Sequence, residues 1–101
     1  MEYGLSENTI EEIRAVFRRF PQIRSVRLFG SRAMGNYHTG SDIDLAVEAE
    51  ELTPTELLRI QLALDELELL YHIDLVRYET IKNPAFKEHI ERVGLLFYQR
   101  Q

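Results

Sequence analysis

The chain has 101 residues, of which 45% are hydrophobic and 29% are charged, which is typical of one small globular domain spanning residues 1–101. Its formal net charge of −5 argues against broad, charge-driven binding of nucleic acid. Cysteine is absent, which excludes disulfides and thiolate metal sites. No apolar run is long enough to cross a bilayer and no signal peptide opens the chain, so no membrane association and a cytoplasmic location are expected.

The first half of the chain predicts a helix followed by two strands. Apolar residues recur at helical spacing over 7–20, with Ser6 or Asn8 as the cap, and Pro21 ends the pattern. Residues 24–29 and 42–48 read as strands, joined by a loop or short helical turn over 32–40. This short connection favours antiparallel pairing of the two strands.

The second half predicts a helix, a strand, a further helix and a short apolar end. Thr53-Pro54 starts a helix that runs to about Leu70, and residues 71–77 form a third strand. Asn83-Pro84 starts another helix, which Gly94 ends in the C′ position, and residues 95–98 are a fourth strand or the end of that helix. The order predicts an α/β (α+β) fold, a small mixed sheet with helices packed on it, in which a parallel crossover joins the second and third strands.

Two acidic residues stand two apart in the second predicted strand. Side chains at positions i and i+2 of a strand point the same way, so Asp42 and Asp44 share one face, with Cα atoms about 7 Å apart. Ile43, Leu45 and Val47 then point into the core. Two carboxylates held side by side repel each other unless a cation or a proton offsets the charge. Mg²⁺ held by carboxylates and substrate phosphate oxygens is the usual solution.

A Gly-Ser pair precedes these acids by ten residues and lies where the first strand ends. Gly30 allows a ligand to approach the backbone, and the Ser31 hydroxyl and the following amides can donate to phosphate oxygens. Arg32 adds a permanent positive charge. The segment thus offers phosphate donors at one end and metal ligands at the other, which suits a nucleoside triphosphate with Mg²⁺.

A third acidic residue, Asp74, stands in the middle of the apolar third strand, where a carboxylate is unusual. We interpret it as part of the same site, with pairing to Arg77 or an N-terminal arginine as the alternative. The three histidines lack metal-ligand spacing and are interpreted as structural or exposed, although His72 shares a face with Asp74 and can line the rim of the site.

This combination, Gly30-Ser31, ten residues, Asp42-x-Asp44 and a strand-borne Asp74, resembles the minimal nucleotidyltransferases of the polymerase-β-like superfamily over nearly the whole chain. Small members resemble MntA-type antitoxins, which are encoded beside HEPN-domain ribonuclease toxins. Many relatives have a second basic residue where this chain has Met34, which leaves Arg32 as the main nearby cation.

The resemblance implies an enzyme that transfers AMP from ATP to a tyrosine of the HEPN toxin and thereby silences it. Gly30, Ser31 and Arg32 would then bind the triphosphate. Asp42 and Asp44 would bind two Mg²⁺ ions, and Asp74 would be the third metal-site acid or the general base.

Two alternatives stay open. The chain could neutralise the toxin by docking alone, or it could transfer a nucleotide to a small molecule or RNA. It could also assemble as a homo-oligomer or a hetero-oligomer with the toxin.

Overall fold

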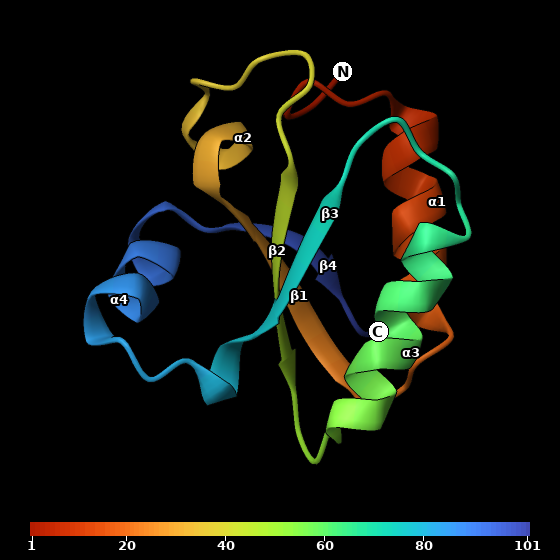
Figure 1. Cartoon of the computed structure of the whole chain (residues 1–101), viewed down its shortest axis with the longest axis vertical. Helices are drawn as coiled ribbons and strands as arrows, with labels where there is room; N and C mark the ends of the chain where they lie inside the picture. The colour runs from red at the N-terminus through yellow and green to blue at the C-terminus, as the bar shows by residue number, and fades with distance from the viewer.

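The computed structural model describes all 101 residues and contains one four-stranded sheet with helices on both of its faces (Figure 1). The elements in chain order are α1 (Glu7–Arg18), β1 (Ile23–Phe29), α2 (Gly30–Met34), β2 (Ile43–Ala49), α3 (Pro54–Asp65), β3 (Ile73–Arg77), the 3₁₀ turn η1 (Tyr78–Thr80), α4 (Pro84–Val93) and β4 (Leu95–Gln99). The predicted α/β class is confirmed, and the apolar segment after α4 is a strand.

The sheet has the strand order β3-β2-β1-β4 and is mixed. β1 pairs antiparallel with β2 and with β4, whereas β2 and β3 are parallel. Both pairings predicted from the length of the connections are confirmed, because a short link reverses the chain and α3 carries it back to the same end of the sheet.

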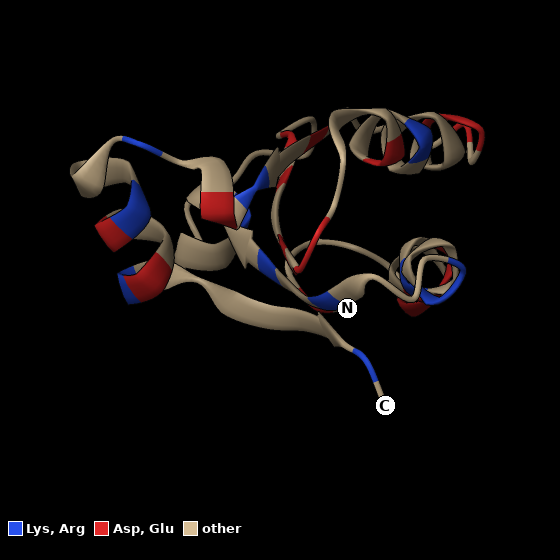
Figure 2. Ribbon diagram, turned by 90° about the horizontal axis from the view of Figure 1, so that it is seen from below, with Lys and Arg blue, Asp and Glu red and all other residues tan.

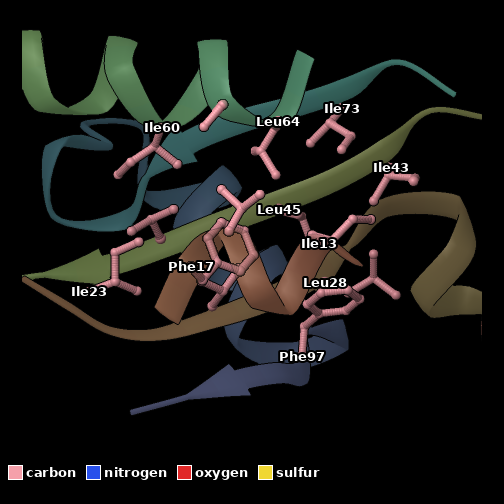
Figure 3. Close-up of a cluster of buried hydrophobic side chains, with 14 of the residues drawn as sticks. Ile13, Phe17, Ile23, Leu28, Ile43, Leu45, Ile60, Leu64, Ile73 and Phe97 are labelled. Atoms are coloured by element: carbon pink, nitrogen blue, oxygen red, sulfur yellow. The ribbon is translucent and has the colours of Figure 1, made fainter. Parts of the chain in front are cut away.

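The larger core lies between one face of the sheet and the helices α1 and α3 (Figure 3). Alternate residues of β2, namely Ile43, Leu45, Val47 and Ala49, are fully buried in this core. The residue between them, Ala46, belongs to a second, smaller cluster with Phe29 and Ile90 under α4. The even-numbered positions of β2 therefore face α4, and the odd-numbered positions face α1 and α3.

Two predicted helices end earlier than expected. α1 ends at Arg18, shortly before Pro21, because a proline disfavours helical backbone angles in the residue that precedes it. α3 ends at Asp65 rather than near Leu70, and Glu68 takes a left-handed conformation with φ of 53°. Leu67 and Leu69 still pack against the core, which is why their apolar pattern imitated a longer helix.

The starts of the helices follow the predicted capping chemistry. Ser6, rather than Asn8, accepts a hydrogen bond from the backbone of Thr9 at the start of α1. Thr53 and Glu56 form a reciprocal capping box at α3. Asn83 accepts from the first two amides after Pro84 at α4.

Gly94 ends α4, but as the C-cap with an extended backbone rather than in the left-handed C′ conformation that was predicted. Its N–H donates to the Ile90 carbonyl oxygen at 2.8 Å, and a Cβ there would lie 2.3 Å from that oxygen. Glycine is needed here because of this close approach, which lets the chain turn directly into β4.

Charges of both signs are interspersed along the helices (Figure 2). No helix combines the length and the apolar composition that a membrane span requires.

Candidate active site

The parallel pairing of β2 with β3 places two of the predicted acids directly beside each other. Asp44 and Asp74 are register partners in this ladder, and neighbouring strands lie about 4.8 Å apart. Both have the even-numbered orientation that faces α4. Asp42 lies one residue before β2 and is exposed, as is Asp74, whereas Asp44 is half-buried. The acids therefore meet where β2 and β3 begin.

The proximity of the acids affects the electrostatics of Asp44. Its pKa is raised above the usual value, first by burial and then by the negative charges of Asp74 and Asp42, and the nearby His72 offsets part of the effect. Asp44 makes no ion pair with a lysine or arginine of the chain. The protein thus holds a carboxylate whose charge is not compensated by its own cations, which is the usual condition of a metal-binding carboxylate before the metal binds.

Gly30 brings the backbone against this carboxylate. It follows Phe29, which is the register partner of Asp44 in β1, and it has a φ of 73°. A Cβ at this position would lie 2.3 Å from Oδ2 of Asp44. Both the left-handed backbone and the close approach require glycine, so the turn from β1 into α2 begins in direct contact with the acids.

Ser31 lies in the first turn of α2, next to Gly30. Its carbonyl accepts hydrogen bonds from Gly35 and Asn36, but its hydroxyl makes no hydrogen bond within the chain. The first amides of a helix also lack helical acceptors. Hydroxyl and amide donors are therefore available beside Gly30, whose backbone lies against Asp44.

Arg32 was predicted to supply a free positive charge to the phosphates, and the structure places its side chain inside the protein. Its side chain is buried, with 2% exposure, and its guanidinium donates to the backbone carbonyls of Tyr3, Thr39 and Ser41. These four hydrogen bonds engage all three guanidinium nitrogens, so Arg32 holds together the backbone segments around the site. Sequence spacing cannot show this, because the direction of the side chain depends on Tyr3, which is 29 residues away.

The donor set fits Mg²⁺ that is shared with a substrate. No group of three or more histidine, cysteine, aspartate and glutamate side chains is arranged so that it could hold a metal ion by itself. Mg²⁺ is usually held by one or two carboxylates together with substrate phosphates rather than by a cage of protein ligands. Asp44 and Asp74, with Asp42 directly before β2, offer carboxylate oxygens near the Gly30 turn, which suits a metal ion that is also bound by a phosphate ligand.

Residues outside the predicted motif also shape this end of the sheet. His72 contributes to the field at Asp44, and its carbonyl accepts from the backbone of Ile43 at 2.9 Å, which ties the starts of β3 and β2 together. Tyr71 packs its ring against the Arg32 guanidinium. The shared face of His72 and Asp74 was readable from strand alternation, whereas no sequence signal pointed to Tyr71.

Comparison with known proteins shows the family of the chain. A family model described as "Polymerase beta, Nucleotidyltransferase" matches residues 11–101. A candidate protein adenylyltransferase of Methanocaldococcus jannaschii is 37% identical over 91 residues, which cover 82% of this chain and 92% of the relative.

Solved structures agree with the fold. A candidate minimal nucleotidyltransferase superposes with a TM-score of 0.71 and 30% identity over 94% of this chain and 95% of the other. A toxin–antitoxin structure with AMP-PNP superposes with a TM-score of 0.70 and 26% identity over 96% of this chain and 76% of that one. The chain therefore belongs to the polymerase β nucleotidyltransferase family and is a minimal nucleotidyltransferase.

Proposed function

We propose that this nucleotidyltransferase transfers the AMP group of ATP to a tyrosine hydroxyl of a partner HEPN-domain ribonuclease toxin, and that the transfer requires Mg²⁺. The observation that carries the proposal is the direct pairing of Asp44 with Asp74 beside the Gly30 turn. The likeness to a toxin–antitoxin structure with a bound nucleotide analogue supports an acceptor that is itself a protein.

In the proposed reaction, the tyrosine oxygen attacks the α-phosphorus of ATP in line with the bond to the β-phosphate oxygen. That bond breaks, pyrophosphate leaves, and the tyrosine carries one adenylate through a new P–O bond. Asp74, exposed beside Asp44, takes the proton from the hydroxyl or completes the metal site. Ser31 and the first amides of α2 bind phosphate oxygens.

Asp42 and Asp44, with Asp74, would hold the Mg²⁺ ions, which when bound offset the phosphate charge and orient the triphosphate. The exposure of Asp42 and Asp74 suits an acceptor that enters from a second protein, since these acids lie on an accessible part of the sheet. A docking-only antitoxin would not need three uncompensated carboxylates beside a phosphate-binding turn.

The test incubates the chain with labelled ATP, Mg²⁺ and the protein encoded by the neighbouring gene. The expected result is a mass increase of one or more adenylates on a tyrosine of the partner and loss of its ribonuclease activity. The double variant Asp42→Asn and Asp44→Asn should lose transfer, whereas Asp65→Asn, which removes an exposed acid of α3, should keep it.

A partner that is silenced equally well by the double variant would show neutralisation by docking alone. A folded wild-type protein that leaves the partner unlabelled but labels RNA or a small hydroxyl compound would replace the proposed acceptor while keeping the chemistry.

A further inference from the structure

Arg32 is a buried cation that lies between two aromatic rings. Its Cζ is 4.8 Å from the centre of the Tyr71 ring and 5.2 Å from that of Tyr37. No carboxylate forms an ion pair with it. A charge taken out of water without a counter-ion is costly, so rings and carbonyl dipoles must stabilise it here.

The guanidinium joins three separate backbone segments. Nη1 donates to the Tyr3 carbonyl at 2.8 Å, which fixes the segment before α1. Nη2 donates to the Thr39 carbonyl at 3.3 Å and to the Ser41 carbonyl at 2.9 Å, and Nε donates to the same Ser41 oxygen at 3.2 Å. The connection between α2 and β2 is therefore held from inside at its last residues.

Ser41 receives the strongest attachment. Its carbonyl accepts two bonds from Arg32, its Oγ accepts the backbone N–H of His38 at 2.7 Å, and its own N–H donates to the His38 carbonyl at 3.0 Å. The Ser41 carbonyl belongs to the peptide that leads directly into Asp42. The conformation of that peptide is thus set by the guanidinium.

Asp42 depends on this attachment because the sheet does not hold it. It lies outside β2, its side chain is exposed, and the first bond between the two strands is made by Ile43. Asp44, in contrast, is fixed within the β2 ladder between β1 and β3. The two acids of the motif are therefore positioned by different means.

We propose that Arg32 is a positioning residue that sets the direction of the Asp42 carboxylate through the Ser41 peptide, and that it makes no bond to the nucleotide. The proposal rests on the proposed function for the use of Asp42 as a metal ligand. It explains why a cation next to a phosphate-binding turn faces inward. Partners that orient a metal ligand typically contribute about 10- to 100-fold to metal affinity or activity.

The test compares Arg32→Met and Arg32→Lys with a matched control, Arg77→Met. Arg77 also donates to two backbone carbonyls, those of Leu52 and Ala49, but it lies near the opposite end of β2. Binding of Mn²⁺ together with α,β-methylene-ATP is measured by electron paramagnetic resonance. Amide hydrogen exchange over residues 36–42 is followed by mass spectrometry.

We expect Arg32→Met to weaken Mn²⁺ binding by about 10- to 100-fold and to accelerate exchange over 36–42. Arg32→Lys should not restore either property, because one ammonium cannot bridge three carbonyls in the planar geometry of a guanidinium. Arg77→Met should lose thermal stability yet keep wild-type Mn²⁺ affinity. In transfer assays at Mg²⁺ concentrations that saturate the variant, Arg32→Met should lower kcat with a KM for ATP near the wild-type value.

Arg32→Lys that restores Mn²⁺ binding and changes only the KM for ATP would overturn the proposal, because a point charge suffices for a phosphate contact. Wild-type exchange rates over 36–42 in Arg32→Met would also overturn it. If that variant does not fold, Tyr37→Leu removes one of the two rings that contact the guanidinium and should give the same shifts to a smaller extent. Mn²⁺ binding and amide hydrogen exchange are both measured in the absence of nucleotide transfer. The two measurements therefore test the role of Arg32 even if the HEPN-domain toxin is not the acceptor.

Discussion

At the scale of single residues, Gly30 makes the sharpest prediction. Gly30→Ala places a Cβ against Asp44 Oδ2 and forces an L-residue into a left-handed backbone, which costs about 1–2 kcal/mol. We expect a lower Tm together with loss of nucleotide transfer. Gly35→Ala is the matched control: its φ is 84° but nothing lies within 4 Å of the added Cβ. It should lower Tm similarly while transfer persists. Equal losses of transfer in both variants would contradict a special role for the Gly30 contact.

Asp44→Asn separates the effect of this carboxylate on the stability of the fold from its role in nucleotide transfer. Because burial and the neighbouring acids raise the pKa of Asp44, the native apoprotein binds a proton at this site more readily than the unfolded chain does. The Asp44 side chain therefore does not destabilise the native state at low pH, where it is protonated. It becomes destabilising as pH rises through the raised pKa and the carboxylate ionises. In EDTA, Asp44→Asn should have a higher Tm than wild type at pH 7 and nearly the same Tm at about pH 3. Transfer should fall by more than about 100-fold, since outer partners of a metal alone contribute that much.

A wild-type protein that is more stable than Asp44→Asn in EDTA at pH 7 would show that an unrecognised partner compensates the carboxylate.

How much of the site could be predicted differs from residue to residue. Asp44 and Asp74 were found because strand alternation fixes their faces and apolar neighbours fix their strands. The inward direction of the Arg32 side chain was not predicted, because Ser31 beside it suggested phosphate binding, while Tyr3 and Tyr71, which contact the guanidinium, are distant in the sequence. Local pattern predicts which face of an element a residue occupies, but not which tertiary partners a flexible side chain selects.

At the scale of elements, α3 supports the sheet from the face opposite Asp44 and Asp74. Thr53→Ala removes the capping box at its start and should destabilise the fold by about 0.5–2 kcal/mol. For a domain of this size, each kcal/mol lowers Tm by about 4–8 °C. Calorimetry should show this decrease, while kcat stays near wild type at a temperature where the variant is folded.

Thr55→Ala is the control for this change, because the Thr55 side chain makes no hydrogen bond within the chain. An equally large decrease in Tm for Thr55→Ala would assign the effect to the loss of threonine rather than to the cap.

The ends of elements were less predictable than their existence. The Pro54 start of α3 follows from local chemistry, and it is where the sequence placed it. The end of α3 at Asp65 is set by the turn that returns the chain to β3, while Leu67 and Leu69 continue the apolar pattern into that turn. Periodicity reports burial, and buried residues outside a helix can imitate its continuation.

At the scale of the whole molecule, the charge balance predicts how the nucleotide binds. The chain has a formal net charge of −5, its site gathers three acids, and Arg32 is occupied by backbone carbonyls. α,β-methylene-ATP without a divalent cation should therefore leave Tm nearly unchanged. With Mg²⁺ at ligand concentrations about 100-fold above Kd, binding adds about 2.7 kcal/mol, which raises Tm by about 10 °C or more. A comparable increase in EDTA would show that protein cations reach the phosphates.

The alternation of β2 has a consequence for changes in chain length. One face of this strand fills the main core and the other carries Asp44, so removing a single residue between Ile43 and Ala49 would exchange the two faces for all strand residues on one side of the deletion. A carboxylate, Asp44 or Glu48, could then be forced into the apolar interior while core residues turn outward. An insertion at the exposed turn around Leu70, which is 96% exposed, disturbs neither face. The core packing and the position of Asp44 thus both depend on the register of β2. Insertions and deletions are therefore expected to be tolerated in the loops and not in this strand.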